Sequence, residues 1–261
     1  MMRTSLKEKL KNRELSIGSW IQIGHPAVAE IMASQGFDWL CVDLEHGHID
    51  LESLTNILRT LEAYDITSLV RVPKNDEVWI RRSLDAGADG LIIPMINSEE
   101  DAQNAVNFSK YPPEGLRGFG YCRANGYGEK FNSYVERIND EVVIVAQIEH
   151  FSAIANLNSI LNVEGIDAVF IGPLDLSGSY GHTGNLDSPE MKKALEHYLS
   201  LCEKMRIPAG LHIVNPDNSS LSNAIKSGYT FIALGLDVYF LKDGAQNSLD
   251  KILMFKETIE S

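Results

Sequence analysis

The chain has 261 residues, of which 44% are hydrophobic, so it is long enough to bury the core of one large domain. Its 23 basic and 36 acidic residues give a net charge of -13, which argues against nucleic acids and anionic membranes as partners. No apolar stretch approaches the roughly 18 residues that a membrane span requires, and the charged start, MMRTSLKEKLKNRE, lacks an apolar signal core, so we expect a soluble cytoplasmic protein.

Eight short apolar runs are typical of β-strands, and segments of helical periodicity separate them. In chain order, the predicted strands lie near residues 16–22, 39–45, 67–72, 90–95, 141–149, 168–173, 207–213 and 231–237. Such strands, alternating with helices, indicate a parallel sheet covered by helices. Eight units in a chain of this size favour a (β/α)8 barrel, the TIM barrel fold, over a doubly wound open sheet. No linker divides the chain, so we predict one domain over residues 1–261.

A short pattern that joins a helix to a strand occurs four times. A helical segment ends at a glycine, and a polar residue two positions later precedes the next strand; the pairs are Gly36 and Asp38, Gly87 and Asp89, Gly165 and Asp167, and Gly228 and Thr230. Glycine just past a helix end accepts the left-handed conformation that closes the last turn. Each copy therefore predicts a connection from a helix to a parallel strand.

The longest interruption of this pattern, residues 110–140, is rich in glycine and aromatic residues (YPPEGLRGFGYCRANGYGEKF). A loop of this length in a compact domain usually has a function or contacts a partner. It lacks the strand and helix context of a phosphate-binding glycine loop, so we do not expect nucleotide binding. We interpret it as a mobile lid or a subunit contact.

Polar residues follow several of the predicted strands, where ligands bind in either parallel architecture. They are Asp43, Glu45, His46 and His48 after the second strand, Arg71 at the end of the third, Gln147 and Glu149 at the end of the fifth, and Gly172, Leu174 and Asp175 after the sixth. In a barrel these residues meet at one mouth.

Glu149 and Asp175 are candidate ligands of a hard divalent cation. Each alone would be an ordinary solvated or salt-bridged acid, but adjacent strand ends bring the two carboxylates together. Ligation by oxygen alone favours Mg²⁺, Mn²⁺ or Co²⁺ over zinc. Two protein ligands leave coordination positions open, which suits a substrate that chelates through two oxygens, such as a 2-oxo acid.

His46 is a candidate general base, because histidine is the side chain that most readily exchanges a proton near neutral pH. The alternative is an ordinary surface histidine. His48 lies two residues further on, and the pair could also form a metal site, which we favour less because no further histidine ligand has a clear position except His150 or His212.

Arg71 places a charge in a strand that is otherwise apolar. A buried guanidinium needs an anionic partner, which could be a substrate carboxylate or a developing enolate, or could be Asp43 or Glu45 in a core ion pair. Asp85 lies near a predicted helix end, where the helix dipole disfavours an acid, and this misfit hints at a tertiary partner.

Six motifs, in this order and spacing, resemble the HpcH/HpaI aldolase family of metal-dependent pyruvate aldolases: GFDWLCVDLEHGHID, LVRVP, DAGADGLIIPM, YPPEGLRGFG, AQIE and VFIGPLDLSGSYG. The resemblance runs from Gly18 to Leu241. It implies a barrel of the phosphoenolpyruvate/pyruvate superfamily, assembled as homo-oligomeric trimers or hexamers in which the last helix packs on a neighbouring subunit. Such enzymes reversibly cleave 4-hydroxy-2-oxo acids to pyruvate, or a related 2-oxo acid, and an aldehyde, through a metal-stabilised enolate.

The resemblance also implies a role for each matching residue. The metal ligands fall on Glu149 and Asp175; the catalytic histidine falls on His46, the arginine near the oxyanion on Arg71, the aspartate that raises the basicity of the histidine on Asp85, and the substrate contacts on Gln147, Gly172 and Leu174. No Schiff-base lysine is required.

One stretch departs from the family pattern. Where relatives commonly have E-H-A-P-N-D, this chain has EHGHID, so the catalytic histidine is kept while its neighbours change. This makes His48 and Asp50 candidates for selecting the aldehyde. Two other functions remain open: an acyl-CoA lyase of the citrate or malyl-CoA lyase type, which would need an adenine-nucleotide site, and a non-catalytic 2-oxo-acid-binding protein, which would not need a base.

Overall fold

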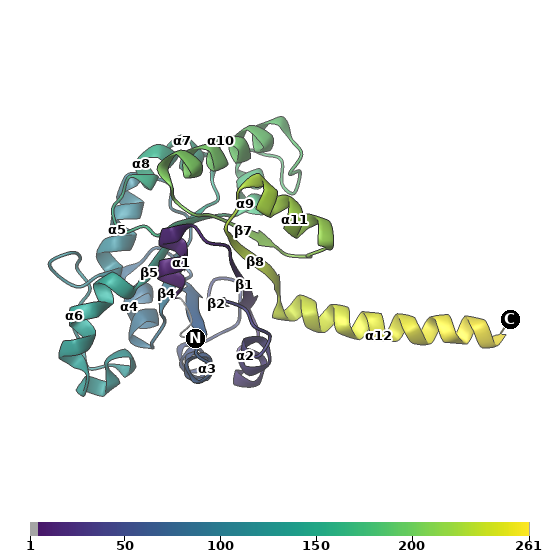
Figure 1. Ribbon diagram of the computed structural model, residues 1–261, viewed down its shortest axis with the longest axis horizontal. Helices are drawn as coiled ribbons and strands as arrows, with labels where there is room; N and C mark the ends of the chain where they lie inside the picture. Colours follow the sequence, from purple (N-terminus) through teal and green to yellow (C-terminus); the bar gives the residue numbers. More distant parts are fainter. Residues whose placement is uncertain (1–4, 261) are drawn as a thin grey trace.

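The computed structural model describes residues 5–260, and the side chains of all of these except residues 218 and 253–260. It contains a closed barrel of eight parallel strands in the order β1 to β8 (Figure 1). The strands are β1 (Ser16–Ile21), β2 (Trp39–Asp43), β3 (Thr67–Arg71), β4 (Gly90–Ile93), β5 (Val143–Ile148), β6 (Ala168–Ile171), β7 (Ala209–Ile213) and β8 (Phe231–Leu236). Each falls within a predicted run, which confirms the (β/α)8 barrel and excludes the open sheet.

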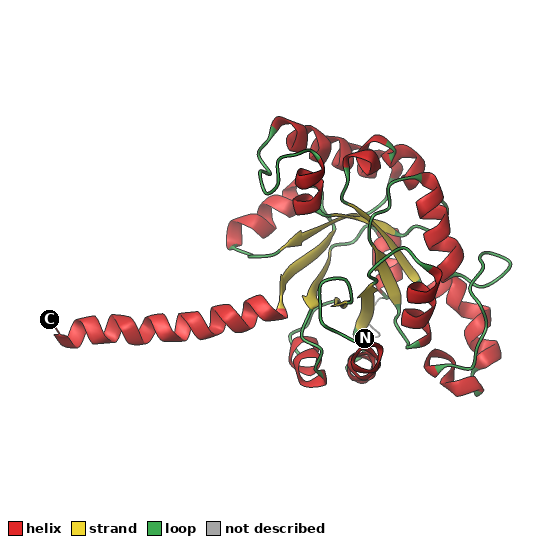
Figure 2. Ribbon diagram, turned by 180° about the vertical axis from the view of Figure 1, so that it is seen from behind, coloured by secondary structure: helices red, strands yellow, loops and turns green. Residues whose placement is uncertain are grey.

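Helices surround the strands on the outside of the barrel (Figure 2). In chain order, the helices of the described residues are α1 (Leu6–Asn12), α2 (Pro26–Ala33), α3 (Leu51–Ala63), α4 (Glu77–Asp85), α5 (Glu99–Ser109), the 3-10 helix η1 (Arg123–Gly128), α6 (Phe131–Glu141), α7 (Phe151–Ala155), α8 (Leu157–Leu161), α9 (Pro173–Ser179), α10 (Pro189–Met205), α11 (Asn218–Ser227) and α12 (Asp237–Glu260), of which α1 covers one end of the barrel and α12 extends away from it. Several begin where a side-chain oxygen accepts a hydrogen bond from a backbone N–H of the first turn, as Asp50 does for α3, Asp76 for α4 and Ser188 for α10.

Aromatic side chains fill the inside of the barrel. Trp20, Trp39, Phe170 and Phe231 belong to an inner apolar cluster that is separate from the larger cluster between strands and helices. Trp39 and Phe231 pack with ring centroids 4.5 Å apart. Gly18 makes room for this packing, because a Cβ at that position would lie 2.1 Å from the Trp39 ring. The inner cluster therefore depends on large and small residues facing one another across the barrel.

The repeated pattern of glycine and aspartate closes the amino-terminal end of the barrel. Three aspartates at the starts of even-numbered strands accept the backbone N–H of a residue at the start of the strand before: Asp38 from Ile17 at 2.9 Å, Asp89 from Ser68 at 2.8 Å and Asp167 from Ile144 at 2.8 Å. Helix α1 covers this end, with Leu6 and Leu10 in the inner cluster. Its Lys9 and Lys7 pair with Asp38 and Asp167.

The long segment between α5 and β5 also lies toward the amino-terminal end, because α5 leads away from the mouth and α6 leads into the start of β5. The buried Arg117 guanidinium lies 4.6 Å from the centre of the Tyr111 ring and donates to Asp85 at 2.7 Å. This position excludes a lid over the mouth of the same chain. A subunit contact remains our interpretation of the segment.

Helix α12 extends away from the barrel, as Figure 1 shows in yellow. Asp237, at its first residue, accepts the backbone N–H groups of Gln22 at 3.0 Å and Ile23 at 2.8 Å, and so ties the start of the helix to the end of β1. Leu241, Leu249 and Ile252 are exposed along it. Among the described residues, no helix is long and apolar enough to cross a membrane.

Replacing Gly18 with alanine should destabilise the barrel, because the added methyl group overlaps the Trp39 ring. We expect a loss of about 2–3 kcal/mol in the free energy of unfolding, measured by urea denaturation. Gly120→Ala is the matched control, since a Cβ there meets nothing within 4 Å. Equal stability of both variants would show that the inner cluster repacks at little cost.

Candidate active site

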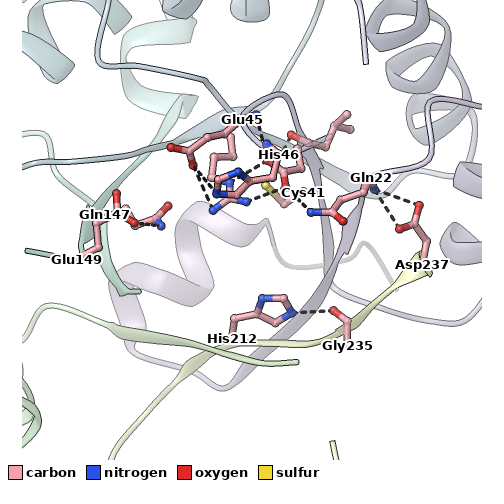
Figure 3. Close-up of polar contacts among 12 residues, drawn as sticks. Gln22, Cys41, Glu45, His46, Gln147, Glu149, His212, Gly235 and Asp237 are labelled. Atoms are coloured by element: carbon pink, nitrogen blue, oxygen red, sulfur yellow. Dashed lines mark hydrogen bonds and ion pairs between the residues drawn. The ribbon is translucent and has the colours of Figure 1, made fainter. Parts of the chain in front are cut away.

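A cavity of about 260 Å³ opens at the carboxyl ends of the strands. The predicted residues that line it are His46, Arg71, Gln147, Gly172, Leu174 and Asp175. The lining also includes Asp43, another of the predicted strand-end residues, and His212, together with Trp20, Gln22 and Tyr239, which the sequence did not single out. Figure 3 shows several of these side chains directed toward one another from different strands. These strand-end residues therefore meet at one mouth, whereas Glu45, His48 and Glu149 are not part of the cavity lining.

The period of two along each strand explains which side chains reach the cavity. Cys41, Leu69 and Val145 belong to the inner cluster. The residues two positions later, Asp43, Arg71 and Gln147, point to the same side and come next toward the mouth. The barrel thus changes from an apolar interior to a polar upper layer within one step of each strand.

Arg71 forms the ion pair that the sequence left as an alternative. Its Nε and Nη2 donate to the two carboxylate oxygens of Asp43 at 2.9 and 2.7 Å, and its Nη1 lies 3.3 Å from Oε2 of Glu45. The guanidinium also lies 4.4 Å from the centre of the Trp20 ring. Because Arg71 still lines the cavity, the pair fixes the guanidinium in place without removing it from the mouth.

Both members of this pair are held in their charged forms. Burial alone would raise the pKa of the Asp43 carboxyl, but the hydrogen bonds and charge of Arg71, together with Gln22 and the His46 amide, lower the pKa below its ordinary value. Burial opposes the charge on Arg71, and Asp43 and Glu45 overcome it, so the pKa of Arg71 is raised. The guanidinium is therefore a permanent cation at the base of the mouth.

Glu149 is the most buried of the predicted metal ligands, with 5% of its surface exposed. Its Oε1 accepts the backbone N–H of Met95 at 2.7 Å, and its Oε2 accepts from Nε2 of Gln147 at 2.5 Å. Burial raises the pKa of Glu149 to about 6; the Met95 hydrogen bond opposes the rise, and the negative charges of Glu45 and Asp175 add to it. This carboxylate therefore lies in a place that favours a positive charge beside it.

Asp175 lies in the first turn of α9, next to the end of β6. Gly172, just before that helix, lies so close to Glu149 that a Cβ on it would be 2.9 Å from the Glu149 Cβ and 3.0 Å from Oε2. This contact brings the two strand ends together, whereas a larger residue would push Glu149 away from the start of α9. Asp175 and Leu174 are both exposed at the rim.

The residues present fit a divalent cation. Glu149, Asp175, Glu45 and Asp43 bring four carboxyl groups close to the mouth, and Arg71 pairs with two of them, Asp43 and Glu45. Among the described residues, the buried Oε1 of Gln147 has no hydrogen-bond partner. Within the part of the chain that the structure describes, no three His, Cys, Asp or Glu side chains form a ready metal cluster. A cation here would thus have few protein ligands and an open coordination sphere.

His46 lies at the rim of the cavity with 61% of its side chain exposed, and its Nε2 is 4.0 Å from Oε2 of Glu45. The other two residues of this loop behave differently. The Asp50 carboxylate accepts the Ser53 backbone N–H at 2.7 Å and begins α3, which is a structural role. His48 is exposed, and neither His48 nor Asp50 lines the cavity.

Asp85 is the predicted site residue that the structure does not bring to the mouth. It ends α4, which runs from the carboxyl end of β3 to the amino end of β4, so it lies at the opposite end of the barrel from His46. Its carboxylate pairs with the buried Arg117 at 2.7 Å. The tertiary partner suggested by the sequence is therefore an arginine of the long segment, within one chain.

His212 lines the cavity, although sequence reasoning considered it only as a possible further ligand of the less favoured histidine metal site. Its Nε2 is 2.9 Å from the carbonyl oxygen of Gly235, and its ring stacks on Trp20 with centroids 5.5 Å apart. Burial lowers the pKa of His212 to about 4; the Gly235 carbonyl opposes this shift, and the charge of Arg71 adds to it. The available signal was a polar residue two positions after Gly210, at an inward position of a predicted strand.

Residues 16–243 match the family model described as HpcH/HpaI aldolase/citrate lyase. A 4-hydroxy-2-oxovalerate aldolase of Novosphingobium aromaticivorans is 38% identical over 94% of this chain and 93% of its own length. A hydroxypyruvate/pyruvate aldolase of Sagittula stellata is 36% identical over 93% of this chain and 95% of its own length.

A solved structure supports the same relationship. The crystal structure of an HpcH/HpaI aldolase/citrate lyase family protein from Burkholderia cenocepacia superposes with a TM-score of 0.90 at 30% identity. The match covers 95% of this chain and 98% of that protein. The resemblance noted in the sequence motifs is thereby confirmed over nearly the whole chain.

The raised pKa of Glu149 predicts how the stability of the metal-free protein depends on pH. Below the ordinary glutamate pKa the carboxyl is protonated in the folded and unfolded states, whereas above about pH 6 the folded state carries a buried charge. Stability should therefore fall as pH rises through this window. In chelator, urea denaturation should show Glu149→Gln gaining about 2 kcal/mol over the unmodified protein between pH 4 and pH 7. A stability difference that does not change with pH would contradict this account of the carboxylate.

Proposed function

Because the chain belongs to the HpcH/HpaI aldolase/citrate lyase family, we propose that it is a divalent-metal-dependent aldolase that reversibly cleaves a 4-hydroxy-2-oxo acid into pyruvate, or a related 2-oxo acid, and an aldehyde. The observation that carries this proposal is the buried Glu149 carboxylate, which feels the charge of Asp175 and contacts Gln147 in the lining of the cavity that Arg71 and His46 also line. The aldolase names of the two relatives, both matched over nearly their full length, support it.

Glu149 and Asp175 would hold the metal, for which Mg²⁺, Mn²⁺ and Co²⁺ are the candidates because both ligands are oxygens. When bound, the cation supplies Lewis acidity toward the oxygens of a 2-oxo acid. Gln147 orients Glu149 by donating to its Oε2, which leaves the Gln147 carbonyl oxygen available to the substrate or to water. The backbone at Gly172 and Leu174, at the start of α9, would receive the substrate carboxylate.

His46 would act as the general base for cleavage. Its imidazole takes the proton from the C4 hydroxyl as the C3–C4 bond breaks and the aldehyde forms. The electron pair of that bond moves toward C3 and the 2-oxo oxygen, where negative charge develops. Arg71 stabilises this charge through N–H groups that Asp43 does not use, and its pairing with Asp43 keeps the guanidinium from reorienting during the reaction. Return of a proton to C3 completes the 2-oxo acid product.

The role that we propose for Asp85 requires a second copy of the chain. Within one chain, Asp85 and His46 lie at opposite ends of the barrel, so the aspartate can raise the basicity of the histidine only across a subunit contact. A homo-oligomer, a trimer or a hexamer, is therefore part of the proposal. The extended α12, with exposed Leu249 and Ile252, would pack on a neighbouring subunit.

Metal removal and loss of the base test the proposed activity. In EDTA, release of pyruvate from a panel of 4-hydroxy-2-oxo acids should stop, and Mn²⁺, Co²⁺ or Mg²⁺ should restore it. His46→Ala should lower turnover by about 10²–10⁴-fold in the presence of metal, because it removes the general base. A coupled assay for pyruvate measures both effects.

The control for His46 is His197→Ala, on the exposed face of α10, which should leave turnover unchanged. Full activity in chelator would refute the role of the metal, and near-normal turnover of His46→Ala would assign the base to another residue. Tight metal-dependent binding of pyruvate without any turnover would instead indicate a non-catalytic binding protein.

Deleting residues 245–261 tests the role of α12. Light scattering after size-exclusion chromatography should show the unmodified protein as a trimer or hexamer and the shortened protein as a smaller species, because the exposed apolar face of the helix is lost. The double variant Leu249→Glu/Ile252→Glu should weaken assembly in the same way. Lys251→Ala, at an exposed polar position between them, should not. Unchanged assembly of the shortened protein would exclude this helix as the subunit contact.

A further inference from the structure

The wall of the cavity opposite β3 is formed by β7 and β8 and is largely apolar. It contains Val214, Leu236 and, on β1, the Trp20 ring. His212 lies among them and presents its imidazole to the same cavity as Asp175 and Gln147. Figure 3 marks the contact between the His212 ring and Gly235 with a dashed line.

The contacts of His212 fix which nitrogen carries the proton. A carbonyl oxygen can only accept, so the 2.9 Å contact between Nε2 and the Gly235 carbonyl requires a proton on Nε2. Burial and the nearby Arg71 charge lower the pKa of His212 to about 4, so the ring is neutral at working pH and Nδ1 carries a lone pair. Among the described side chains, Nδ1 of His212 has no hydrogen-bond partner. It is also not one of the unpaired polar atoms that are completely buried, so a ligand can reach it.

The ring cannot turn away from this arrangement without losing two contacts. The His212 ring would give up its hydrogen bond to Gly235 and its stacking on Trp20, where the planes of the two rings differ by 24°. Two other neighbours hold Trp20 in place: the Arg71 guanidinium lies over its ring at 4.4 Å from the ring centre, and Phe170 packs edge-on with ring centroids 6.0 Å apart. The acceptor at Nδ1 is therefore preorganised before any ligand binds.

We propose that His212 is a substrate-binding residue whose Nδ1 accepts a hydrogen bond from a hydroxyl group of the substrate, so that the enzyme selects hydroxylated substrates over their unhydroxylated counterparts. This inference rests on the proposed aldolase function and adds a substrate class to it. The hydroxyl can belong to either half of the reaction, as the C3 hydroxyl of hydroxypyruvate or as the hydroxyl of an aldehyde such as glycolaldehyde.

A hydroxyl is the group that this site recognises best for two reasons. A substrate methyl group placed against Nδ1 would displace water and leave the lone pair without a donor, which is unfavourable in a buried site. An anionic group of the substrate, beyond the carboxylate of its 2-oxo acid, would gain nothing from Nδ1, because both atoms are hydrogen-bond acceptors. The neighbouring Val214 and Leu236 accommodate the carbon atoms that carry the hydroxyl.

The experiment measures kcat/KM in the direction of C–C bond formation for two matched pairs of compounds. Hydroxypyruvate is compared with pyruvate at fixed aldehyde, and glycolaldehyde is compared with acetaldehyde at fixed 2-oxo acid, all with saturating Mg²⁺. His212→Phe keeps a ring on Trp20 but has no acceptor, and His212→Leu keeps only apolar volume. In both variants the preference for the hydroxylated member of one pair should fall by about tenfold, the effect of one neutral hydrogen bond. The pair that responds identifies which half of the substrate reaches His212.

Two further variants control this comparison. His212→Asn retains an acceptor oxygen and should keep more of the preference than phenylalanine does. His197→Phe makes the same change on the exposed face of α10 and should keep all of it. Circular dichroism and the thermal midpoint show whether each variant is folded.

Wild-type preferences retained by both His212→Phe and His212→Leu would overturn the proposal. The unmodified protein gives a second test that needs no variant. A kcat/KM for both hydroxylated compounds below that of their counterparts would overturn it, and a higher value for one pair would support it. Absence of turnover with every compound would refute the proposed aldolase function instead, so the two failures are distinguishable.

Discussion

Charge buried at the mouth of the barrel is the constraint on which the candidate site depends. Asp43 is fully buried, and transferring a carboxylate from water into such a place costs several kcal/mol unless a partner compensates it. Arg71 provides that compensation through two parallel hydrogen bonds, and the pair in turn holds Glu45 and the amide of His46. One ion pair therefore sets the positions of the Arg71 guanidinium, the His46 backbone and the Glu45 carboxylate.

Glu149 is buried to a similar degree, but its partners are neutral. The Met95 amide and the Gln147 side chain donate hydrogen bonds to it, and neither carries a charge. The two carboxylates therefore differ in pKa: the pKa of Asp43 is lowered, whereas the pKa of Glu149 is raised to about 6. A divalent cation would supply for Glu149 the compensation that Arg71 supplies for Asp43, so the electrostatics of the folded chain and the proposed metal point to the same carboxylate.

The two ends of the barrel use acidic residues for different purposes. At the amino-terminal end, Asp38 and Asp167 accept strand amides and pair with lysines of α1, so their charges are satisfied within the chain. Asp85 and Arg117 form another satisfied pair there. At the carboxyl end, acids outnumber their basic partners. This asymmetry follows the general division of such barrels into a stabilising end and a reactive end.

Much of this organisation could be predicted from the sequence because it depends on local periodicity. The eight strands and the residues at their ends follow from apolar runs, and Glu149, Asp175 and Arg71 were identified by position alone. The partner of Asp85 could not be predicted, since Arg117 is 32 residues away in a segment without periodicity. Whether Arg71 pairs with Asp43 depends on the register of β2 against β3, which sets the two side by side and which no single strand encodes.

The predicted specificity residues lie outside the lining of the cavity. The departure of EHGHID from the family pattern directed attention to His48 and Asp50, but Asp50 caps α3 and neither residue lines the cavity. Asp50 is a residue that this chain shares with the family pattern, and its bond to the Ser53 amide begins α3. The sequence offered His212 only as a possible further ligand of a histidine metal site. The partners of its ring, the Trp20 side chain and the Gly235 carbonyl, come from β1 and β8 and meet it only when the barrel closes.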